Sequence, residues 1–276
     1  LLWLDAGNVS FPNSVVDRIV PATSKEDLRD VSKQLKINDV WPVVTEPYVS
    51  WILEQKFSSP QPNWGSVGVS LVTDIVPYEE AKLRLLNGAH SLIAYLGQLT
   101  HKETVAETVE DAIFGKVVKG FMKEIGETIE SPKALDLRKY QSEIFGRFCN
   151  RALHHKTAQI AADGSEKIPQ RWLKAIIVLR REKKPVRFLA LALAVWIRYL
   201  QGSSEEGTKL VISDPRKDRL IRIVTSGFKE TEMITDIIAL LNSDLATDLS
   251  LIADIKGYHS EIVSDGCRAT ITRLIS

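Results

Sequence analysis

The sequence predicts a mainly α-helical fold with short extended segments near the N-terminus. Of the 276 residues, 44% are apolar and 26% charged, which is typical of a globular protein with ample material for a core. From Pro77 onward apolar residues recur at helical spacing, and only three prolines precede the one at position 215. Residues 1–76 are instead rich in Pro, Val, Trp and turn residues, which favours short strands and helices joined by loops.

The first part of the chain is expected to hold two short helices and a strand. A helix is predicted over Ser24 to Leu35, because a serine can cap it and acidic residues occupy its first turn. A second helix is predicted from about Glu46 to Lys56, with Pro47 suited to its first helical position. The stretch Val67 to Val72 alternates in part and is the best strand candidate.

The second part is expected to consist of helices separated by polar loops. The segments DGSEK at 163–167 and QGSSEEG at 201–207 are predicted linkers, because each carries Gly and helix-capping residues. The apolar run FLALALAVWI at 188–197 indicates a buried core helix. The predicted helices span 77–99, 105–125, 134–150, 154–162, 169–182, 186–201, 216–224 and 230–243, with a last one near the C-terminus.

Charge and cysteine content exclude several function classes. The 36 basic and 35 acidic residues leave a net charge of +1, which argues against a nucleic-acid or acidic-membrane partner. The longest apolar run is too short for a membrane-spanning helix, which needs about 20 residues. Cys149 and Cys267 fit neither a disulfide framework nor a zinc site, so a reducing cytoplasm is the expected location.

The sequence lacks several common catalytic motifs, which excludes the chemistry that they support. The sequence has no GxGxxG, no GxxxxGK[ST], no HExxH and no GxSxG, so no self-contained dinucleotide-binding unit is expected within it. None of its five histidines has persuasive metal-ligand spacing, and no metal is expected. The start, LLWLDAGN, has no initiator Met and no signal-peptide pattern, so we expect a fragment of a longer protein.

The segment DIVPYEEAKLRLLNGAHSLIAYLG at 74–97 is the most informative. On an α-helical wheel, Lys82, Asn87 and His90 lie at roughly 0°, 140° and 80°, so three polar groups project from one side among leucines and isoleucines. A lysine among apolar neighbours gives up its proton more readily than one in water, and Asn and His can stabilise developing alkoxide charge. A solvated flank carries such residues more often than a catalytic set does, so the spacing leaves both interpretations open.

The segment KLRLLNGAHS resembles the Lys-x4-Asn-x2-His signature of the polyol-specific long-chain dehydrogenases. This family includes mannitol 2-dehydrogenase, fructuronate reductase (mannonate oxidoreductase) and tagaturonate reductase. Nearly the whole chain is similar to it, because three further stretches agree in order: FPNSVVDRIVP at 11–21, WPVVTEPYVSWILEQKF at 41–57 and GRFCNRALHHKTAQIAADGSEKIPQR at 146–171.

The resemblance implies a two-domain enzyme of which this chain is one part. Members carry an N-terminal Rossmann-like domain that binds NAD or NADP and a mainly helical C-terminal domain that supplies the catalytic lysine. Residues 1–276 are assigned to the C-terminal substrate and catalytic domain, and the Rossmann domain is expected to be absent from this chain. Lys82 is implied to be the general acid/base, and Asn87 and His90 to bind the reacting oxygen and its neighbour.

Other residues match the family at positions near the substrate. The resemblance places Val16 and Asp17 there, with Asp17 a candidate acceptor for a substrate hydroxyl. Arg147 is implied to bind substrate hydroxyls or a carboxylate, although an arginine that caps a helix end fits equally well. Lys167 in DGSEK either lies near the site or is a solvated loop residue, and the solvated interpretation is preferred.

The expected substrate is a small polyol or hexonate. Interconversion of a sugar alcohol and a ketose, of the mannitol and fructose type, is preferred on the similarity of WPVVTEPY. The alternatives are fructuronate reductase or tagaturonate reductase activity and, from another class, a non-catalytic helical scaffold. The choice between NAD and NADP and the oligomeric state are left open.

Overall fold

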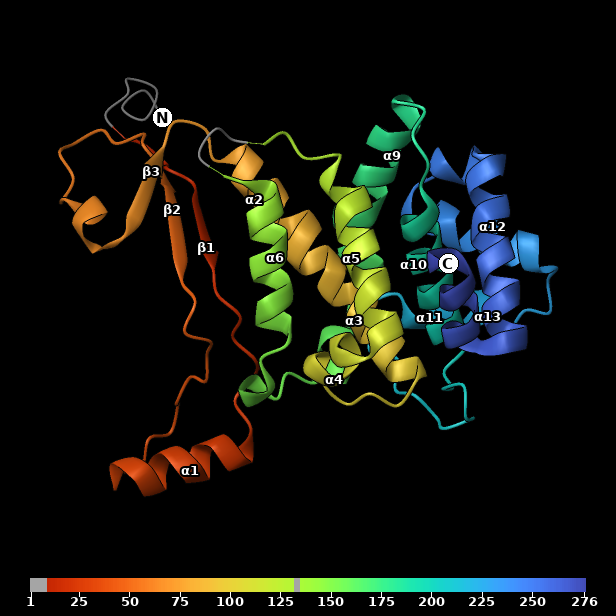
Figure 1. Cartoon of the computed structure of the whole chain (residues 1–276), viewed down its shortest axis with the longest axis horizontal. Helices are drawn as coiled ribbons and strands as arrows, with labels where there is room; N and C mark the ends of the chain where they lie inside the picture. Colours follow the sequence, from red (N-terminus) through yellow and green to blue (C-terminus); the bar gives the residue numbers. More distant parts are fainter. Residues whose placement is uncertain (1–8, 132–134) are drawn as a thin grey trace. The chain divides into compact units, whose positions relative to one another are not determined.

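The computed structural model describes residues 9–131 and 135–276, which divide into two compact units. The first unit comprises Leu1–Lys82 and Ser131–Ala134, and the second comprises Leu83–Glu130 and Leu135–Ser276. Figure 1 shows the sheet in the first unit and the helices that make up the second. The predicted mainly helical fold with a small extended part is therefore confirmed. The predicted start of one helix at Ala134 lies outside the described residues.

The first unit is built on a three-stranded sheet of order β1-β2-β3. Strand β1 (Ser14–Asp17) pairs antiparallel with β2 (Ser50–Glu54), which pairs parallel with β3 (Val69–Val72). Strand β3 confirms the predicted strand. The helix predicted over Glu46 to Lys56 is wrong, because pairing with strands on both sides overrides the local helix signals there.

Among the described residues of this unit are two α-helices, and a buried carboxylate holds one of its loops. Helix α1 (Lys25–Leu35) confirms the prediction, since Ser24 and Asp27 form a reciprocal capping box. Helix α2 (Val76–Ala81) leads out of the unit. The buried Glu46 carboxylate accepts a 2.6 Å hydrogen bond from the Ile19 backbone N–H, which fixes the chain between β1 and β2.

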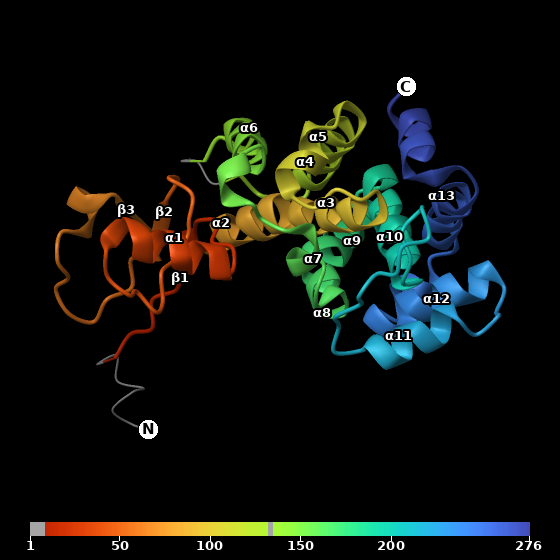
Figure 2. The ribbon, with the colours of Figure 1, turned by 90° about the horizontal axis from the view of Figure 1, so that it is seen from below.

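The second unit is a bundle of helices around a buried centre. In the described part of the chain, two segments are π-helical, Lys82–Asn87 between α2 and α3, and Pro169–Leu173 between α8 and α9. Figure 2 shows α11 and α12 at one end of the bundle, where they pack together. The α-helices are α3 (Gly88–Leu99), α4 (Val105–Glu110), α5 (Ala112–Gly126), α6 (Leu137–Phe148), α7 (Thr157–Ile160), α8 (Gly164–Ile168), α9 (Lys174–Arg181), α10 (Arg187–Leu200), α11 (Lys217–Val224), α12 (Glu230–Leu241) and α13 (Leu249–Ile275).

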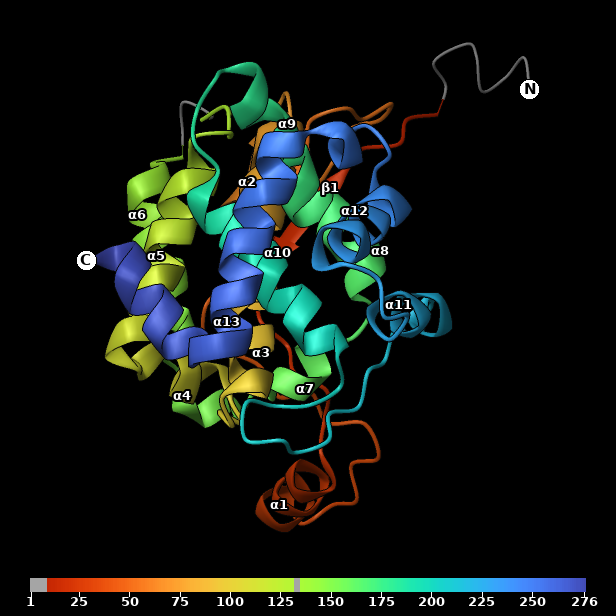
Figure 3. The same ribbon diagram turned by 90° about the vertical axis from the view of Figure 1, so that its right-hand side faces the viewer.

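Helix α10 forms the centre of this bundle. It packs against α3, α5 and α13 (Figure 3). Every residue from Leu189 to Ile197 is fully buried. The predicted core helix is therefore confirmed. Burial of such an apolar stretch supplies the main driving force for assembling the surrounding helices. Within residues 9–131 and 135–276, no helix combines the length and apolar character required to cross a membrane.

Two predicted boundaries within the bundle are wrong. The single helix expected over 105–125 is divided at Asp111, whose extended backbone and capping carboxylate start α5. The segment 163–167, predicted as a linker, is mostly helical because it forms α8. There the Ser165 hydroxyl and backbone N–H both donate to the Asp214 carboxylate, so a contact distant in sequence stabilises the turn.

The long C-terminal helix α13 is interrupted near its end. Gly266 has φ 84° and ψ 164°, a backbone conformation that residues with a Cβ rarely adopt. The next N–H, that of Cys267, donates to the carboxylate of Glu205, which lies in the loop after α10. The final helical segment therefore receives its N-terminal cap from a distant part of the chain.

Close packing on α3 gives a stability prediction for Gly97→Ala. An added Cβ would lie 2.5 Å from Thr157 Cγ2, 2.8 Å from Thr108 Oγ1 and 2.9 Å from the Lys102 carbonyl oxygen. Overpacking of this kind is expected to lower the free energy of unfolding by about 1–3 kcal/mol. Urea unfolding measures this change. Gly257→Ala, at an exposed helical position with open space around it, is the control and should instead be neutral or stabilising.

Candidate active site

The predicted lysine and asparagine bound a π-helical turn. Lys82 opens and Asn87 closes this turn, which lies within one continuous helical stretch from Val76 to Leu99. In a π-helix, hydrogen bonds join residues i and i+5, so Lys82 and Asn87 come to the same side of the helix. The separation of about 140° given by the α-helical wheel is therefore wrong for this pair. Single π-helical turns are frequent at functional sites.

In the first unit, Lys82 contacts the end of strand β1. Its half-buried side chain donates a hydrogen bond from Nζ to the carbonyl oxygen of Val16. The Val16 side chain is 51% exposed, whereas the neighbouring Asp17 is only 4% exposed. The structure therefore places Lys82 against Val16, one of the two β1 residues that the family resemblance associates with the substrate.

In the second unit, Asn87 is held through its main chain. Its carbonyl oxygen accepts a 3.0 Å hydrogen bond from Nη1 of Arg171. The Asn87 side chain is half-buried and makes no hydrogen bond to any other described residue. An amide that is fixed by its backbone and unpaired at its side chain is available to hydrogen-bond a bound molecule.

His90 is a buried imidazole with an unpaired nitrogen. It is 7% exposed, and its ring centroid lies 4.5 Å from that of Phe148 and 5.2 Å from that of His155. Its Nε2 has no hydrogen-bond partner among the described residues. Burial, reinforced by the positive charges that His155, Arg171 and Arg147 can carry, holds the pKa of His90 well below its usual value. The imidazole is therefore neutral near pH 7.

Arg147 lies close enough to act on His90 electrostatically. It occupies the last turn of α6 and is 9% exposed. Its charge contributes to the lowered pKa of His90. In the second unit, His90 and Arg147 therefore belong to one neighbourhood.

Three further residues, Lys167, His155 and Arg171, differ from the expectation or were not singled out from the sequence. Lys167 is not solvated as interpreted, because it is half-buried, its Nζ donates to the Ala162 carbonyl oxygen at 2.6 Å, and burial lowers its pKa. His155 and Arg171 were not singled out, although both lie in the family-like stretch 146–171. That stretch carried the only sequence signal that could have found them.

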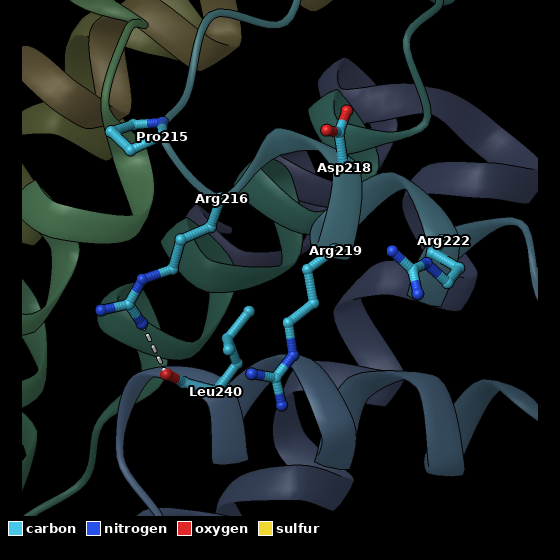
Figure 4. Close-up of a pocket in the computed structure, with 6 residues that line it drawn as sticks. All are labelled: Pro215, Arg216, Asp218, Arg219, Arg222 and Leu240. Carbon is cyan, nitrogen blue, oxygen red and sulfur yellow. Dashed lines mark hydrogen bonds between the residues drawn. The ribbon is translucent and has the colours of Figure 1, made fainter.

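A separate groove lies on the surface of the second unit. It has a volume of about 520 Å³ and is shown in Figure 4, with the guanidinium of Arg216 donating to the Leu240 carbonyl oxygen. It contains none of the predicted site residues. Its lining residues are Pro215, Arg216, Asp218, Arg219, Arg222 and Leu240. In the described part of the chain, no group of three or more His, Cys, Asp and Glu side chains is arranged to hold a metal ion.

Two solved enzyme structures are similar to this chain over nearly its whole length. Pseudomonas fluorescens mannitol 2-dehydrogenase, solved as a ternary complex with NAD and D-mannitol, is 31% identical with a TM-score of 0.89. A D-sorbitol dehydrogenase in substrate-free form is 26% identical with a TM-score of 0.85. The chain covers 56% of each of these structures, and 99% and 98% of the chain are matched.

Curated relatives agree with the structural comparison. D-mannonate oxidoreductase of Escherichia coli (strain K12) is 34% identical over 99% of this chain and 56% of the relative. Mannitol 2-dehydrogenase of Aspergillus niger is 33% identical over 96% of this chain and 55% of the relative. The chain thus spans about half the length of the relatives it matches.

Two family models match successive parts of the chain. Residues 2–66 match the mannitol dehydrogenase Rossmann domain, so the expected absence of that domain is not confirmed. Residues 74–263 match the mannitol dehydrogenase C-terminal domain, and they include the π-helical turn, His90 and Arg147. Since this second match alone covers most of the sequence, the chain belongs to the mannitol dehydrogenase family.

Proposed function

We propose that the full-length protein is an NAD(P)-dependent secondary-alcohol dehydrogenase that interconverts a sugar alcohol and a ketose, with Lys82 as general acid/base. The π-helical turn from Lys82 to Asn87 carries this proposal, because it turns an amine and a free amide to one side of the helix. The neutral His90 follows three residues later on the same helical stretch. An amine, an amide and an imidazole are the groups that proton transfer and alkoxide stabilisation require.

Lys82 is assigned the proton transfer. In the oxidative direction its free amine takes the proton of the carbinol hydroxyl while the C–H bond breaks and the hydrogen departs as hydride. In the reductive direction its ammonium returns that proton to the developing alkoxide. The hydrogen bond from Nζ to the Val16 carbonyl oxygen orients the group for both directions.

The remaining residues are assigned to binding. The Asn87 amide and the His90 Nε2–H donate to the reacting oxygen and its neighbour, an assignment supported by the lack of protein partners for both groups among the described residues. This role requires the neutral His90 tautomer that carries its proton on Nε2. Val16 and Asp17 are assigned to the part of the substrate near Lys82, with Asp17 accepting from a hydroxyl.

The chain's own residues fit a reaction that needs an external hydride carrier. The proposed donor set supplies proton transfer and hydrogen bonding, and none of these side chains accepts a hydride. NAD or NADP, when bound, supplies that acceptor. The sequence contains no glycine-rich dinucleotide loop, so no residue here is assigned to the cofactor phosphates.

A hexonate substrate is the second candidate, as in fructuronate or tagaturonate reductase activity. Arg147 favours it, because this buried guanidinium lies near His90 and a carboxylate is a good partner for arginine. The similarity to both mannitol 2-dehydrogenases and a D-mannonate oxidoreductase is consistent with either substrate class.

The test is initial-rate oxidation by the full-length gene product on mannitol, arabinitol, sorbitol, mannonate and altronate, with NAD and NADP in parallel. Selective turnover of a neutral polyol supports the first candidate, and selective turnover of a hexonate supports the second. A folded protein that is inactive on the whole panel would contradict the enzyme assignment and favour a helical scaffold.

A further inference from the structure

The second π-helical segment, Pro169–Leu173, contacts the end of the first. Nη1 of Arg171 donates to the Asn87 carbonyl oxygen at 3.0 Å and to Ser91 Oγ at 2.8 Å. The adjacent Trp172 donates from Nε1 to the Gly88 carbonyl oxygen at 3.1 Å. Two consecutive side chains of one π-helical segment therefore hold two consecutive carbonyl groups where the other segment ends.

These contacts are formed in a buried environment. Trp172 and Ser91 are completely inaccessible to solvent, and Arg171 is half-buried. A carbonyl oxygen has two lone pairs, so it can accept from a side chain while it also accepts within a helix. Hydrogen bonds from a charged donor are roughly twice as strong as neutral ones, which makes the arginine the firmer of the two attachments.

The guanidinium of Arg171 forms no ion pair with a described acidic residue. Among residues 9–131 and 135–276, no carboxylate lies within ion-pair distance of its guanidinium, and burial lowers its pKa. Removing a cation from water without an opposite charge is costly. The arrangement therefore favours a role for this charge other than simple stabilisation.

The same charge acts on His90. Arg171 is one of the three groups, with His155 and Arg147, whose positive charge disfavours protonation of His90. These groups come from the π-helical segment, the loop before α7 and the end of α6. Arg171 is also bonded to the backbone that carries Asn87.

We infer that Arg171 is a positioning residue, whose guanidinium fixes the turn from Asn87 to Ser91 so that the Asn87 amide and a neutral His90 are presented to the substrate oxygen. This inference rests on the proposed function. It assigns Arg171 no contact with substrate or cofactor. It assigns the arginine two separable effects, a geometric one through its hydrogen bonds and an electrostatic one through its charge.

The experiment compares Arg171→Gln, Arg171→Lys and a matched control in the full-length protein. The control is Arg198→Gln, because Arg198 is also half-buried and also donates to two backbone carbonyl groups, at 2.8 and 3.2 Å, at the far end of α10. For each variant we would measure kcat, KM for the alcohol, the pH profile of kcat/KM and the midpoint of thermal unfolding.

Arg171→Gln is expected to lower kcat by about 10- to 100-fold, since small misplacements of binding groups have effects of this size. It removes one of the charges that keep the pKa of His90 low, so that pKa rises and the acidic limb of the pH profile moves to higher pH. Arg171→Lys keeps the charge, so its acidic limb should stay near that of the wild type while kcat is partly restored.

The control Arg198→Gln distinguishes an effect on the positioning of the site from a general effect on stability. It should lower the unfolding midpoint about as much as Arg171→Gln does, with wild-type kcat and an unmoved pH profile. If Arg171→Gln matches this control in both kinetic readouts, the positioning role is wrong. If Arg171→Gln does not fold, Ser91→Ala replaces it, because this variant removes one hydrogen-bond acceptor of Arg171 and no charge. It should lower kcat without moving the acidic limb of the pH profile. An unchanged kcat would overturn the inference.

The activity of the wild-type protein distinguishes failure of this inference from failure of the proposed function. A folded wild type that is inactive on every substrate overturns the dehydrogenase assignment and the positioning role together. An active wild type with unaffected Arg171 variants overturns the positioning role alone.

Discussion

Replacing Lys82 with alanine is expected to reduce kcat of the full-length protein by at least ~10²-fold, within the range that positioned acid–base groups contribute. The variant removes the proton acceptor and its hydrogen bond to the Val16 carbonyl oxygen. It leaves the Asn87 and His90 side chains in place. The expected result is therefore a loss in kcat that exceeds any change in KM for the alcohol. Initial rates over a range of alcohol concentrations measure both constants.

Lys116→Ala is the matched control for this prediction. Lys116 is exposed on α5 and makes no described hydrogen bond or ion pair, so its loss should leave kcat unchanged. Circular dichroism spectra of both variants would establish that the fold persists. Turnover by a folded Lys82→Ala protein at the wild-type rate would show that another group accepts the proton.

Replacing His90 with phenylalanine is expected to lower kcat by about 10²–10³-fold, the range found when one donor to a developing oxyanion is removed. The substitution keeps an aromatic ring against Phe148 and removes both ring nitrogens. Because Nε2 has no partner among the described residues, its removal leaves no protein group newly unpaired. The loss should therefore appear in catalysis more than in the free energy of unfolding. Paired kinetic and urea-unfolding measurements test that separation.

His154→Asn is the control for His90→Phe. His154 is exposed and has a left-handed backbone with φ 44°, which asparagine tolerates. Its replacement should change neither kcat nor stability appreciably. A large fall in stability with an unchanged kcat for His90→Phe would assign His90 to the core instead of the active site.

Local signals predicted the helical elements well and the sheet poorly. The Ser24 capping box and the apolar run of α10 depend on neighbours in sequence, so α1 and α10 were located from the sequence alone. Strand β2 depends on pairing with residues far away along the chain, and a proline with a preceding glutamate gave a helix signal at the same place. The break at Asp111 was missed because a capping aspartate also fits within an amphipathic pattern.

The residues proposed for the site were identified from the sequence, but their relative positions on the helix were not. Lys82, Asn87 and His90 were identified by the family-like spacing, which a wheel of fixed angle then placed on an α-helix. No composition signal distinguishes a π-helical turn from an α-helical one, so the true relation of Lys82 and Asn87 required the structure. Arg171 escaped notice because its partner Asn87 lies 84 positions away.

The interruption of α13 at Gly266 links the end of the chain to the loop after α10. The helical segment beyond Gly266 ends at Ile275, so it is shorter than the roughly 12–15 residues below which an isolated helix is only marginally stable in water. Its first N–H is bonded to Glu205, 62 positions earlier. We therefore expect the terminal helix and that loop to unfold together, so hydrogen exchange of their amides should rise in both when either is perturbed.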